Sequence, residues 1–190
     1  MFKRGRRSRN PAETEGGDPP DPAKLRSAAR NIAIGLLARR EHAQAEIKRK
    51  LRDRGYDQNT TLEVVDELTR QRLLSDARFA EMFIRSRAER GQGPVRLRGE
   101  LRQLKLPAEL IEQHLSAAQV DWMRLAVEIR QRKFGGATPA TMGERAKQVR
   151  FLQYRGFTTD QIRVALGTSC EDQLLESGDA GDPPDLDPEN

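Results

Sequence analysis

The chain has 190 residues, of which 33% are charged and 36% are hydrophobic, and it carries a formal net charge of +5 at pH 7. This length suits one domain or a few small helical units, and because no stretch of about 18 residues is apolar, no membrane span is expected. The basic start, residues 1–10, lacks the apolar segment of a secretory signal. The one cysteine, Cys170, has no Cys/His cluster beside it, which excludes an internal disulfide and argues against a zinc site. We expect a cytoplasmic monomer without a metal or other cofactor.

The charge is distributed unevenly along the chain. Residues 1–22 carry a net charge of +1, and residues 170–190 carry eight acidic groups and no Lys or Arg, so that residues 23–169 carry +12. A body of this charge is typical of a protein that binds a polyanion, such as a nucleic acid, a nucleoprotein filament or an acidic protein surface. The alternative is that the excess of Lys and Arg only keeps a helical protein soluble.

Both ends of the chain, residues 1–22 and 170–190, are predicted to be disordered tails. They contain segments rich in Pro, Gly and acidic residues, NPAETEGGDPPDP and SGDAGDPPDLDPEN, which cannot bury enough apolar surface to offset their ordering entropy. One hypothesis is that residues 171–189 fold back on the basic body and weaken non-specific DNA binding. The alternative is a tail that is simply solvated.

Between the tails, the spacing of apolar residues predicts helices throughout. Apolar residues recur at helical spacing in residues 29–37, 79–84, 110–118 and 122–129. No run alternates with period two for long enough to indicate a strand. Signals for helix starts and ends follow in chain order: Gly55 at an end, a capping box at residues 60–63, Ser75 before an apolar run, Pro94 and Pro107 at first helical positions, Gly156 at an end, and a capping box at residues 158–161.

An internal repeat organises these helices. Residues 50–57, 100–107 and 151–158 read KLRDRGYD, ELRQLKLP and FLQYRGFT. Each is the end of a basic helix, followed by a turn, an apolar residue and a short helix. Because another amphipathic helix precedes each unit, we predict an all-α fold, an elongated tandem array of three three-helix repeats. Their expected bounds are residues 23–74, 75–119 and 120–169.

Basic residues recur at two equivalent points in each unit, opposite the apolar stripes. For any single residue, solvation of an outer helix face is an adequate explanation, but the array as a whole favours a binding surface. The basic residues assigned to these faces are Arg39, Arg40, Lys48, Arg49, Arg52, Arg85, Arg87, Arg90, Arg96, Arg98, Arg102, Arg130, Arg132, Lys133, Lys147, Arg150 and Arg155.

No set of residues points to catalysis, so an enzyme is not expected. The segment Gly91–Pro94 lacks the Gly-Lys-Ser/Thr ending of a phosphate-binding loop. His42 is expected at a surface helix end and His114 partly buried, and neither has a catalytic partner. Asp76 and Glu81 lack a third acid for a nuclease site, and Asp76 is better explained as an anion in the first turn of a helix. The aromatic residues Trp122, Phe79, Phe83, Tyr56 and Phe157 are assigned to core packing rather than base stacking.

Three blocks of the sequence resemble the RecX family over roughly residues 30–167. Residues 36–42 (LLARREH), with Glu46–Ile47, Lys50–Leu51 and Gly55–Tyr56, are similar to the first repeat of that family. Residues 74–81 (LSDARFAE), with residues 85–87, 90–94 and 98–101, resemble its most diagnostic block. Residues 151–152 and 155–157 are similar to its last repeat.

The sequence departs from the family pattern at two turns. Arg72 and Lys105–Leu106 stand where the family usually has a glycine and Gly-Ile or Gly-Val. A lysine in a left-handed cap costs about 1 kcal/mol relative to glycine. We therefore expect at Lys105 either a different cap or a straighter helix.

The resemblance implies a regulator that binds the RecA recombinase and its filament on single-stranded DNA. Such a protein would suppress ATP hydrolysis, strand exchange and filament growth in recombination and DNA repair, with weak non-specific duplex binding. The residues predicted to contact RecA or DNA are first Arg85, Arg87, Arg90, Arg96 and Arg98, and second Lys48, Arg52, Arg132 and Lys133. The alternative is a transcriptional regulator with tandem helix-turn-helix units, which would prefer a particular duplex sequence.

Overall fold

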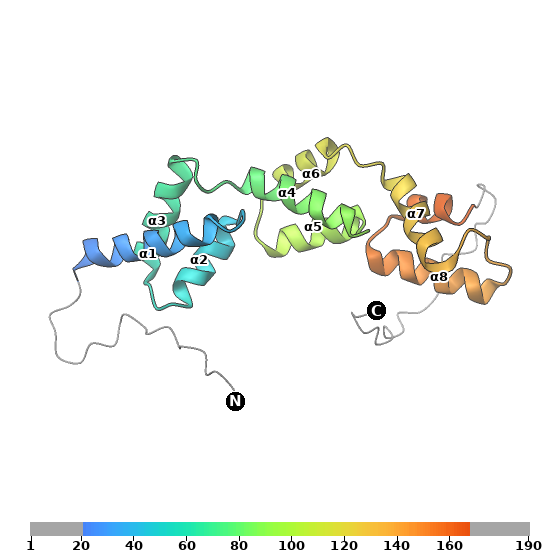
Figure 1. The fold of residues 1–190 in the computed structure, drawn as a ribbon, viewed down its shortest axis with the longest axis horizontal. Coiled ribbons are helices and arrows are strands. Elements are labelled where there is room, and N and C mark those ends of the chain that lie inside the picture. The colour runs from blue at the N-terminus through green and yellow to red at the C-terminus, as the bar shows by residue number, and fades with distance from the viewer. Residues whose placement is uncertain (1–20, 168–190) are drawn as a thin grey trace, which may run out of the picture.

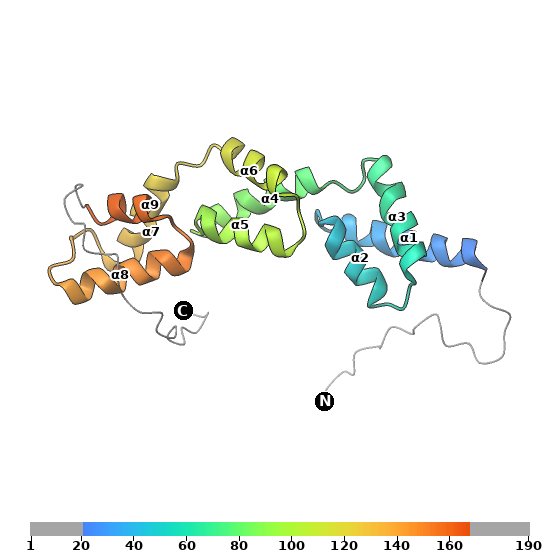
Figure 2. The same ribbon diagram turned by 180° about the vertical axis from the view of Figure 1, so that it is seen from behind.

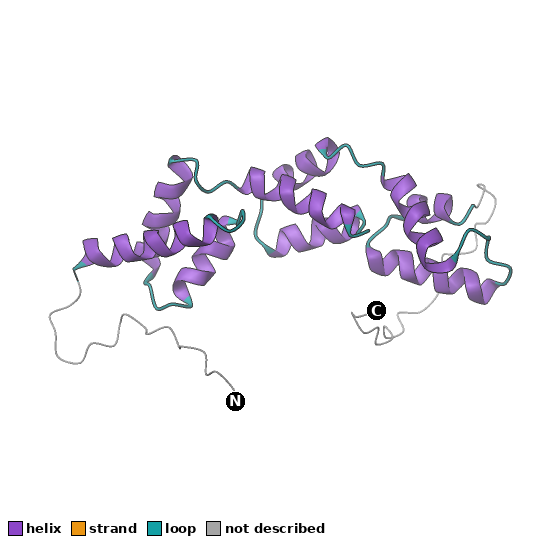
Figure 3. Cartoon of the chain, in the orientation of Figure 1, coloured by secondary structure: helices purple, strands orange, loops and turns teal. Residues whose placement is uncertain are grey.

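The computed structural model describes residues 21–167, and within this range every regular element is an α-helix (Figures 1 and 3). The helices form three consecutive units of three. The first unit contains α1 (Pro22–Leu37), α2 (Gln44–Arg52) and α3 (Gln58–Arg70). The second contains α4 (Asp76–Glu89), α5 (Pro94–Gln103) and α6 (Ala108–Ala117), and the third contains α7 (Trp122–Phe134), α8 (Met142–Arg155) and α9 (Thr159–Ala165).

The three units lie in a row, each around its own core. Closely packed helix pairs belong to the same unit, as α1 with α3 or α7 with α9 (Figure 2). The first core centres on Ile47, Leu51 and Leu68, the second on Phe79, Leu97 and Ile111, and the third on Leu152, Phe157 and Ile162. The predicted all-α, elongated tandem array is therefore confirmed.

Three of the predicted helix starts are confirmed. Ser75 accepts a hydrogen bond from the backbone N–H of Arg78 at the start of α4. At the start of α9, the Gln161 N–H donates to the Thr158 hydroxyl and the Thr158 N–H donates to the Gln161 side chain, as a capping box requires. Pro94 is the first residue of α5, as predicted.

Two other predicted starts are wrong. The capping box expected at residues 60–63 is absent, because α3 begins at Gln58 and is capped by Asp57, whose carboxylate accepts the Thr60 N–H at 2.9 Å. Pro107 is the residue before α6 rather than its first residue. Asp57 competes successfully because a carboxylate in the extended cap position satisfies the same orphan N–H groups.

The three repeated turns share one geometry. Gly55, Lys105 and Gly156 all have positive φ, of 85°, 62° and 86°. In each turn the next N–H returns to a carbonyl five residues earlier, which closes the helix end and requires the left-handed residue. These bonds are Tyr56 N–H to Leu51 O, Leu106 N–H to Leu101 O and Phe157 N–H to Leu152 O.

Lys105 therefore takes the left-handed conformation that glycine usually adopts at such a turn. The expectation of either a different cap or a straighter helix at Lys105 is wrong. Arg72, the other departure from the family pattern, is also left-handed, with φ of 57°. The apolar residues that follow the repeated turns, Tyr56, Leu106 and Phe157, are buried, as predicted for the two aromatic residues. The turn geometry is maintained by the burial of the apolar residue, even where no glycine is present.

The predicted tails lie almost entirely outside the described residues. At the N-terminal side, α1 begins at Pro22, with Asp21 as its cap. The acidic segment 171–189 and Cys170 also lie outside the described range, so the fold-back hypothesis stays a prediction. Within residues 21–167, no helix is long and apolar enough to cross a membrane.

Candidate functional site

The predicted contact residues on α4 are accessible to a partner. The Arg85 side chain is 83% exposed and forms a 3.5 Å ion pair with Glu89 on the same helix. Arg90 is exposed just after α4, and it forms no ion pair within the described residues. Exposed pairs of this kind contribute little to stability. Both guanidinium groups can therefore turn to an anionic ligand at low cost.

Three other predicted contact residues are already bound to glutamates of the second unit. Arg96 Nε lies 2.9 Å from Glu100 Oε1, and Arg87 Nε lies 3.5 Å from Glu100 Oε2. Arg98 binds both carboxylate oxygens of Glu112, at 2.6 and 2.8 Å. The hydrogen bond to Glu100 raises the pKa of Arg96, and the hydrogen bond to Glu112 raises that of Arg98. These arginines contribute less free charge than the sequence suggests.

Two of the arginines from this region also lie over aromatic rings. The guanidinium of Arg87 is 5.0 Å from the centre of the Phe83 ring, and that of Arg96 is 5.5 Å from the centre of the Tyr154 ring. The second contact joins α5 to α8, so it links the second and third units. Such cation–π contacts orient the guanidinium groups and compete with external ligands.

The second junction, where residues 90–96 meet Ile129 and residues 154–157, is built mainly from backbone. The Gly93 N–H donates to the Arg155 carbonyl at 2.8 Å, and the Val95 N–H donates to the Gly156 carbonyl at 3.0 Å. The Arg155 guanidinium donates to the Arg90 carbonyl at 3.2 Å. These bonds dock the loop between α4 and α5 onto the turn between α8 and α9.

Glycines make this backbone approach possible. A Cβ atom on Gly93 would lie 2.3 Å from the Gly156 carbonyl oxygen, and one on Gly156 would lie 2.3 Å from the Arg96 Cβ. A Cβ on Gly91 would lie 2.2 Å from the Ile129 Cδ1. Sequence reasoning identified this segment as a loop between helices but missed its role. Paired glycines were the one available signal, and they do not reveal which backbone they approach.

Trp122 adds an apolar contact between the second and third units. It is the first residue of α7, yet it packs against the core of the second unit. Core packing was predicted correctly for Trp122 and for Phe79, whose ring centre lies 5.5 Å from that of Phe83. The stripe from Trp122 to Ile129 thus serves two cores rather than one.

The first junction, where residues 41–52 meet Asp76, Arg78 and Lys105, depends mainly on side chains. The Gln44 N–H donates to the Asp76 carboxylate at 2.8 Å, and Arg78 Nε lies 2.7 Å from Glu41 Oε1. Ala43 is fully buried in the core of the second unit. Asp76 thus satisfies an orphan N–H at the start of α2 in the neighbouring unit, although it was assigned only to the first turn of its own helix.

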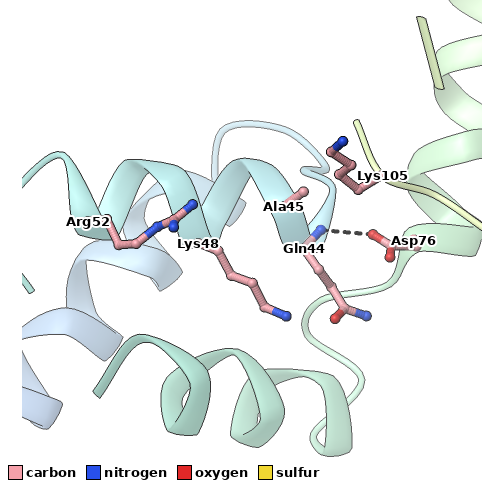
Figure 4. A pocket seen from close by; sticks show the side chains of 6 residues that line it. All are labelled: Gln44, Ala45, Lys48, Arg52, Asp76 and Lys105. Atoms are coloured by element: carbon pink, nitrogen blue, oxygen red, sulfur yellow. Dashed lines mark hydrogen bonds between the residues drawn. The ribbon is translucent and has the colours of Figure 1, made fainter. Parts of the chain in front are cut away.

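A hollow lies at the first junction (Figure 4). Lys48 and Arg52 extend from α2, and Lys105 extends from the facing loop of the second unit. Burial raises the pKa of Asp76. The hydrogen bond from the Gln44 N–H and the charge of Lys48 act in the opposite direction and lower this pKa, but burial has the larger effect. The residues that line the hollow are Gln44, Ala45, Lys48, Arg52, Asp76 and Lys105.

The third unit corrects one of the predicted basic positions. Arg130 was placed on an outer basic face, but it is 3% exposed. Its guanidinium donates to the carbonyl oxygens of Ala165, Gly135 and Ala137, and thereby joins the end of α7 to the end of α9. Arg132 and Lys133 are exposed, as the prediction of a contact surface requires. The apolar stripe gave no sign that an arginine one residue beyond it would turn inward.

His42 is likewise buried rather than at the surface, with 3% of its side chain exposed. Its Nδ1 lies 3.2 Å from Glu46 Oε2, and Arg40 binds the same carboxylate at 3.0 Å. Burial lowers the pKa of His42, assisted by the charge of Arg40 and opposed by Glu46. Burial acts against ionisation of Glu46 too, but its hydrogen bond and attraction to Arg40 dominate and lower the pKa of Glu46. His114 is half-buried, as predicted.

The geometry offers no arrangement for metal chemistry within residues 21–167. No group of three or more His, Cys, Asp or Glu side chains there could hold an ion. Asp76 is committed to the first junction and Glu81 is exposed. The basic residues lie on all three units, and this distribution suits contact with an extended anionic partner.

Comparison with known proteins agrees with this three-unit organisation. Family models described as the first, second and third three-helix domains of RecX match residues 29–68, 75–115 and 119–166. The crystal structure of RecX from Lactobacillus salivarius superposes with a TM-score of 0.66 at 19% identity and covers 76% of this chain and 96% of that one. This likeness concerns the fold alone.

Similarity at the level of sequence is much higher for curated relatives. The regulatory protein RecX of Halorhodospira halophila is 47% identical over 145 residues, which cover 76% of this chain and 90% of that relative. The regulatory protein RecX of Pseudomonas savastanoi pv. phaseolicola is 45% identical over 146 residues, which cover 76% of this chain and 94% of that relative. With all three domains matched in order and relatives aligned over most of their length, the chain belongs to the RecX family of regulatory proteins.

Proposed function

We propose that this protein binds the RecA recombinase and its filament on single-stranded DNA. It thereby inhibits RecA ATP hydrolysis, strand exchange and filament growth during recombination and DNA repair. The observation that carries the proposal is the match of all three domains to those of RecX, a regulatory family. Location in the cytoplasm and action as a monomer form part of the same proposal.

Inhibition by occupancy accounts for this function without any chemistry by the protein itself. An array of three units in a row can lie along a filament and contact several protomers at once (Figure 1). Exposed cations on successive units supply contacts to phosphates or to acidic protein surface, which give affinity without reading base sequence. A bound array of this kind opposes the conformational changes and growth of the filament.

The contact residues fall into three groups with different expected roles. Arg85, Arg90, Arg132 and Lys133 are exposed and can bind an anion directly. Arg87, Arg96 and Arg98 must first exchange their glutamate partners, so we assign them mainly to support of the second unit. Lys48 and Arg52 belong with the hollow at the first junction.

The decisive experiment is ATP hydrolysis by the cognate RecA on single-stranded DNA, with this protein added below stoichiometry. Strong inhibition is expected from the folded wild-type chain. The variant with Arg85→Glu and Arg90→Glu should inhibit at least about tenfold less well while it retains its helicity, because both substitutions reverse charge at exposed positions. A variant with Arg124→Glu, another exposed arginine on an outer helix face, serves as the control.

Absence of any effect of folded wild-type protein on RecA would overturn the proposal. A preference for one duplex sequence would then favour the alternative, a regulator with tandem helix-turn-helix units. Retained inhibition by the double variant would keep the RecA function but reject α4 as the contact surface.

A further inference from the structure

The hollow at the first junction combines positive charge from two units. Lys48 and Arg52 come from α2 of the first unit, and Lys105 comes from the turn between α5 and α6 of the second (Figure 4). None of these three cations forms an ion pair within the part of the chain that the structure describes. By contrast, Arg87, Arg96 and Arg98 each lie within ion-pair distance of a glutamate.

The one acidic group in the lining does not neutralise the hollow. The carboxylate of Asp76 accepts the Gln44 N–H at 2.8 Å and thereby holds the two units together. It can offset one positive charge at most, so that Lys48, Arg52 and Lys105 leave a net charge of about +2. A net positive charge in a partly enclosed hollow attracts an anion more strongly than the same charges spread on an open surface.

Lys105 holds its place at a conformational cost. Its φ of 62° lies in the left-handed region, which glycine adopts freely and a lysine adopts only with strain. The turn itself has no use for an ammonium group, because its hydrogen bonds run between backbone atoms. A strained residue whose side chain reaches a site, rather than supporting the fold, is an indication of function.

We propose that this hollow binds a phosphate of a single-stranded nucleic-acid backbone and thereby bridges the first and second units. The assignment rests on the proposed function, since it places one of the nucleic-acid contacts of the array. The hollow is only partly enclosed, and no described hydrogen bond arranges several backbone N–H groups around it. A phosphate that neighbouring nucleotides hold in place suits such a site better than free inorganic phosphate does.

Lys105→Gly provides the test, because the structural and the binding effects have opposite signs. The substitution relieves the strained turn and should raise the melting temperature by about 2 to 4 °C. It also removes one phosphate contact, which should reduce the slope of log K against log salt by about 0.7 for a single strand. Relative to binding at about 1 M salt, this corresponds to a loss of about fivefold in affinity at about 0.1 M.

Arg72→Gly is the matched control. Arg72 is a basic residue in the same left-handed conformation, but it lies after α3 and does not line the hollow. The control loses the same charge and the same kind of strain, so it should gain similar stability without a change in the salt slope. Binding of a fluorescein-labelled thymidine oligonucleotide to the full chain is measured by anisotropy over a salt series, with melting followed by circular dichroism.

Equal affinities and salt slopes for Lys105→Gly and Arg72→Gly would overturn the phosphate assignment. Displacement of the oligonucleotide by millimolar inorganic phosphate from wild type, but not from Lys105→Gly, would indicate a free-anion site and would also overturn it. If the wild type bound no oligonucleotide at all, both the phosphate site and the DNA contact of the proposed function would be overturned. Inhibition of RecA would still be tested separately, by ATP hydrolysis.

Discussion

The two junctions between units are built in different ways. At the second, backbone donors of Gly93 and Val95 meet backbone acceptors of Arg155 and Gly156, and glycines allow the chains to touch. At the first, the Asp76 carboxylate and the Glu41–Arg78 ion pair hold the units together around a hollow. A backbone junction cannot adjust without breaking its hydrogen bonds, whereas a side-chain junction can respond to pH or to a bound ligand. We infer that the first junction is the adjustable one.

The largest effect is expected from Gly93→Ala at the second junction. The added methyl group would lie 2.3 Å from the Gly156 carbonyl oxygen, and neither backbone can move without loss of their hydrogen bonds. We expect the free energy of unfolding, measured by urea denaturation, to fall by about 3 kcal/mol.

The control for this substitution is Gly99→Ala, at the middle of α5, where a Cβ meets only open space. Alanine there should raise stability by up to about 1 kcal/mol, because it is the better helix former. Equal stabilities for Gly93→Ala and Gly99→Ala would show that the second junction adjusts after all.

A smaller effect is expected from Asp76→Ala at the first junction. The variant leaves the Gln44 N–H at the start of α2 without its partner, which should cost about 1 kcal/mol. Asp76→Asn keeps a side-chain oxygen that can accept this bond and should lie within about 0.5 kcal/mol of wild type. Urea denaturation and amide exchange at Gln44 measure the difference, and equal losses from both variants would contradict the capping role.

The smallest effect concerns pH and also distinguishes the junctions. Burial lowers the pKa of His42 from its ordinary value of 6.5, so the unfolded chain binds the His42 proton more readily than the folded protein. The resulting stability is fully present above pH 6.5 and is lost as the pH falls through 6.5 towards the lowered pKa. Glu46, with its pKa lowered from 4.5, stays ionised in this range.

The test compares urea midpoints between about pH 7.5 and about pH 5.5 for wild type and His42→Gln. Wild type should lose stability with acidification, and the variant should lose less. Amide exchange should increase around residues 41–44 but not at Gly93, because His42 lies beside the first junction only. Faster exchange at Gly93 as well would show that the two junctions are coupled.

Sequence reasoning was sufficient for the architecture because the repeat is a local pattern. The recurrent turn and the apolar residue after it, as in Gly156–Phe157, identify each unit from a few neighbouring positions. Ser75 and the Thr158–Gln161 pair cap their helices through contacts within four residues. Interactions of such short range can be predicted from spacing alone.

The properties of individual charged residues were much harder to predict. Arg96 and Glu100 have the spacing of an ion pair on one helix, a signal that was available and not used. Arg98 and Glu112 lie on different helices, and Arg130 turns inward to the Ala165 carbonyl at the end of α9 and to two carbonyls after α7. These partners depend on how helices pack, which the local pattern does not contain. The number of free cations was therefore overestimated for the second unit.

The cores also differ in how much of the chain they need, and this bears on folding during synthesis. The first core uses only residues 25–74, so it can close as soon as that segment has left the ribosome. The second extends from Ala43 to Trp122 and borrows a side chain from each neighbour. Because chains emerge from the N-terminus, the middle unit must wait for the start of α7 before its core is complete. A translational pause just before Trp122 would leave that unit the least protected part of the nascent chain.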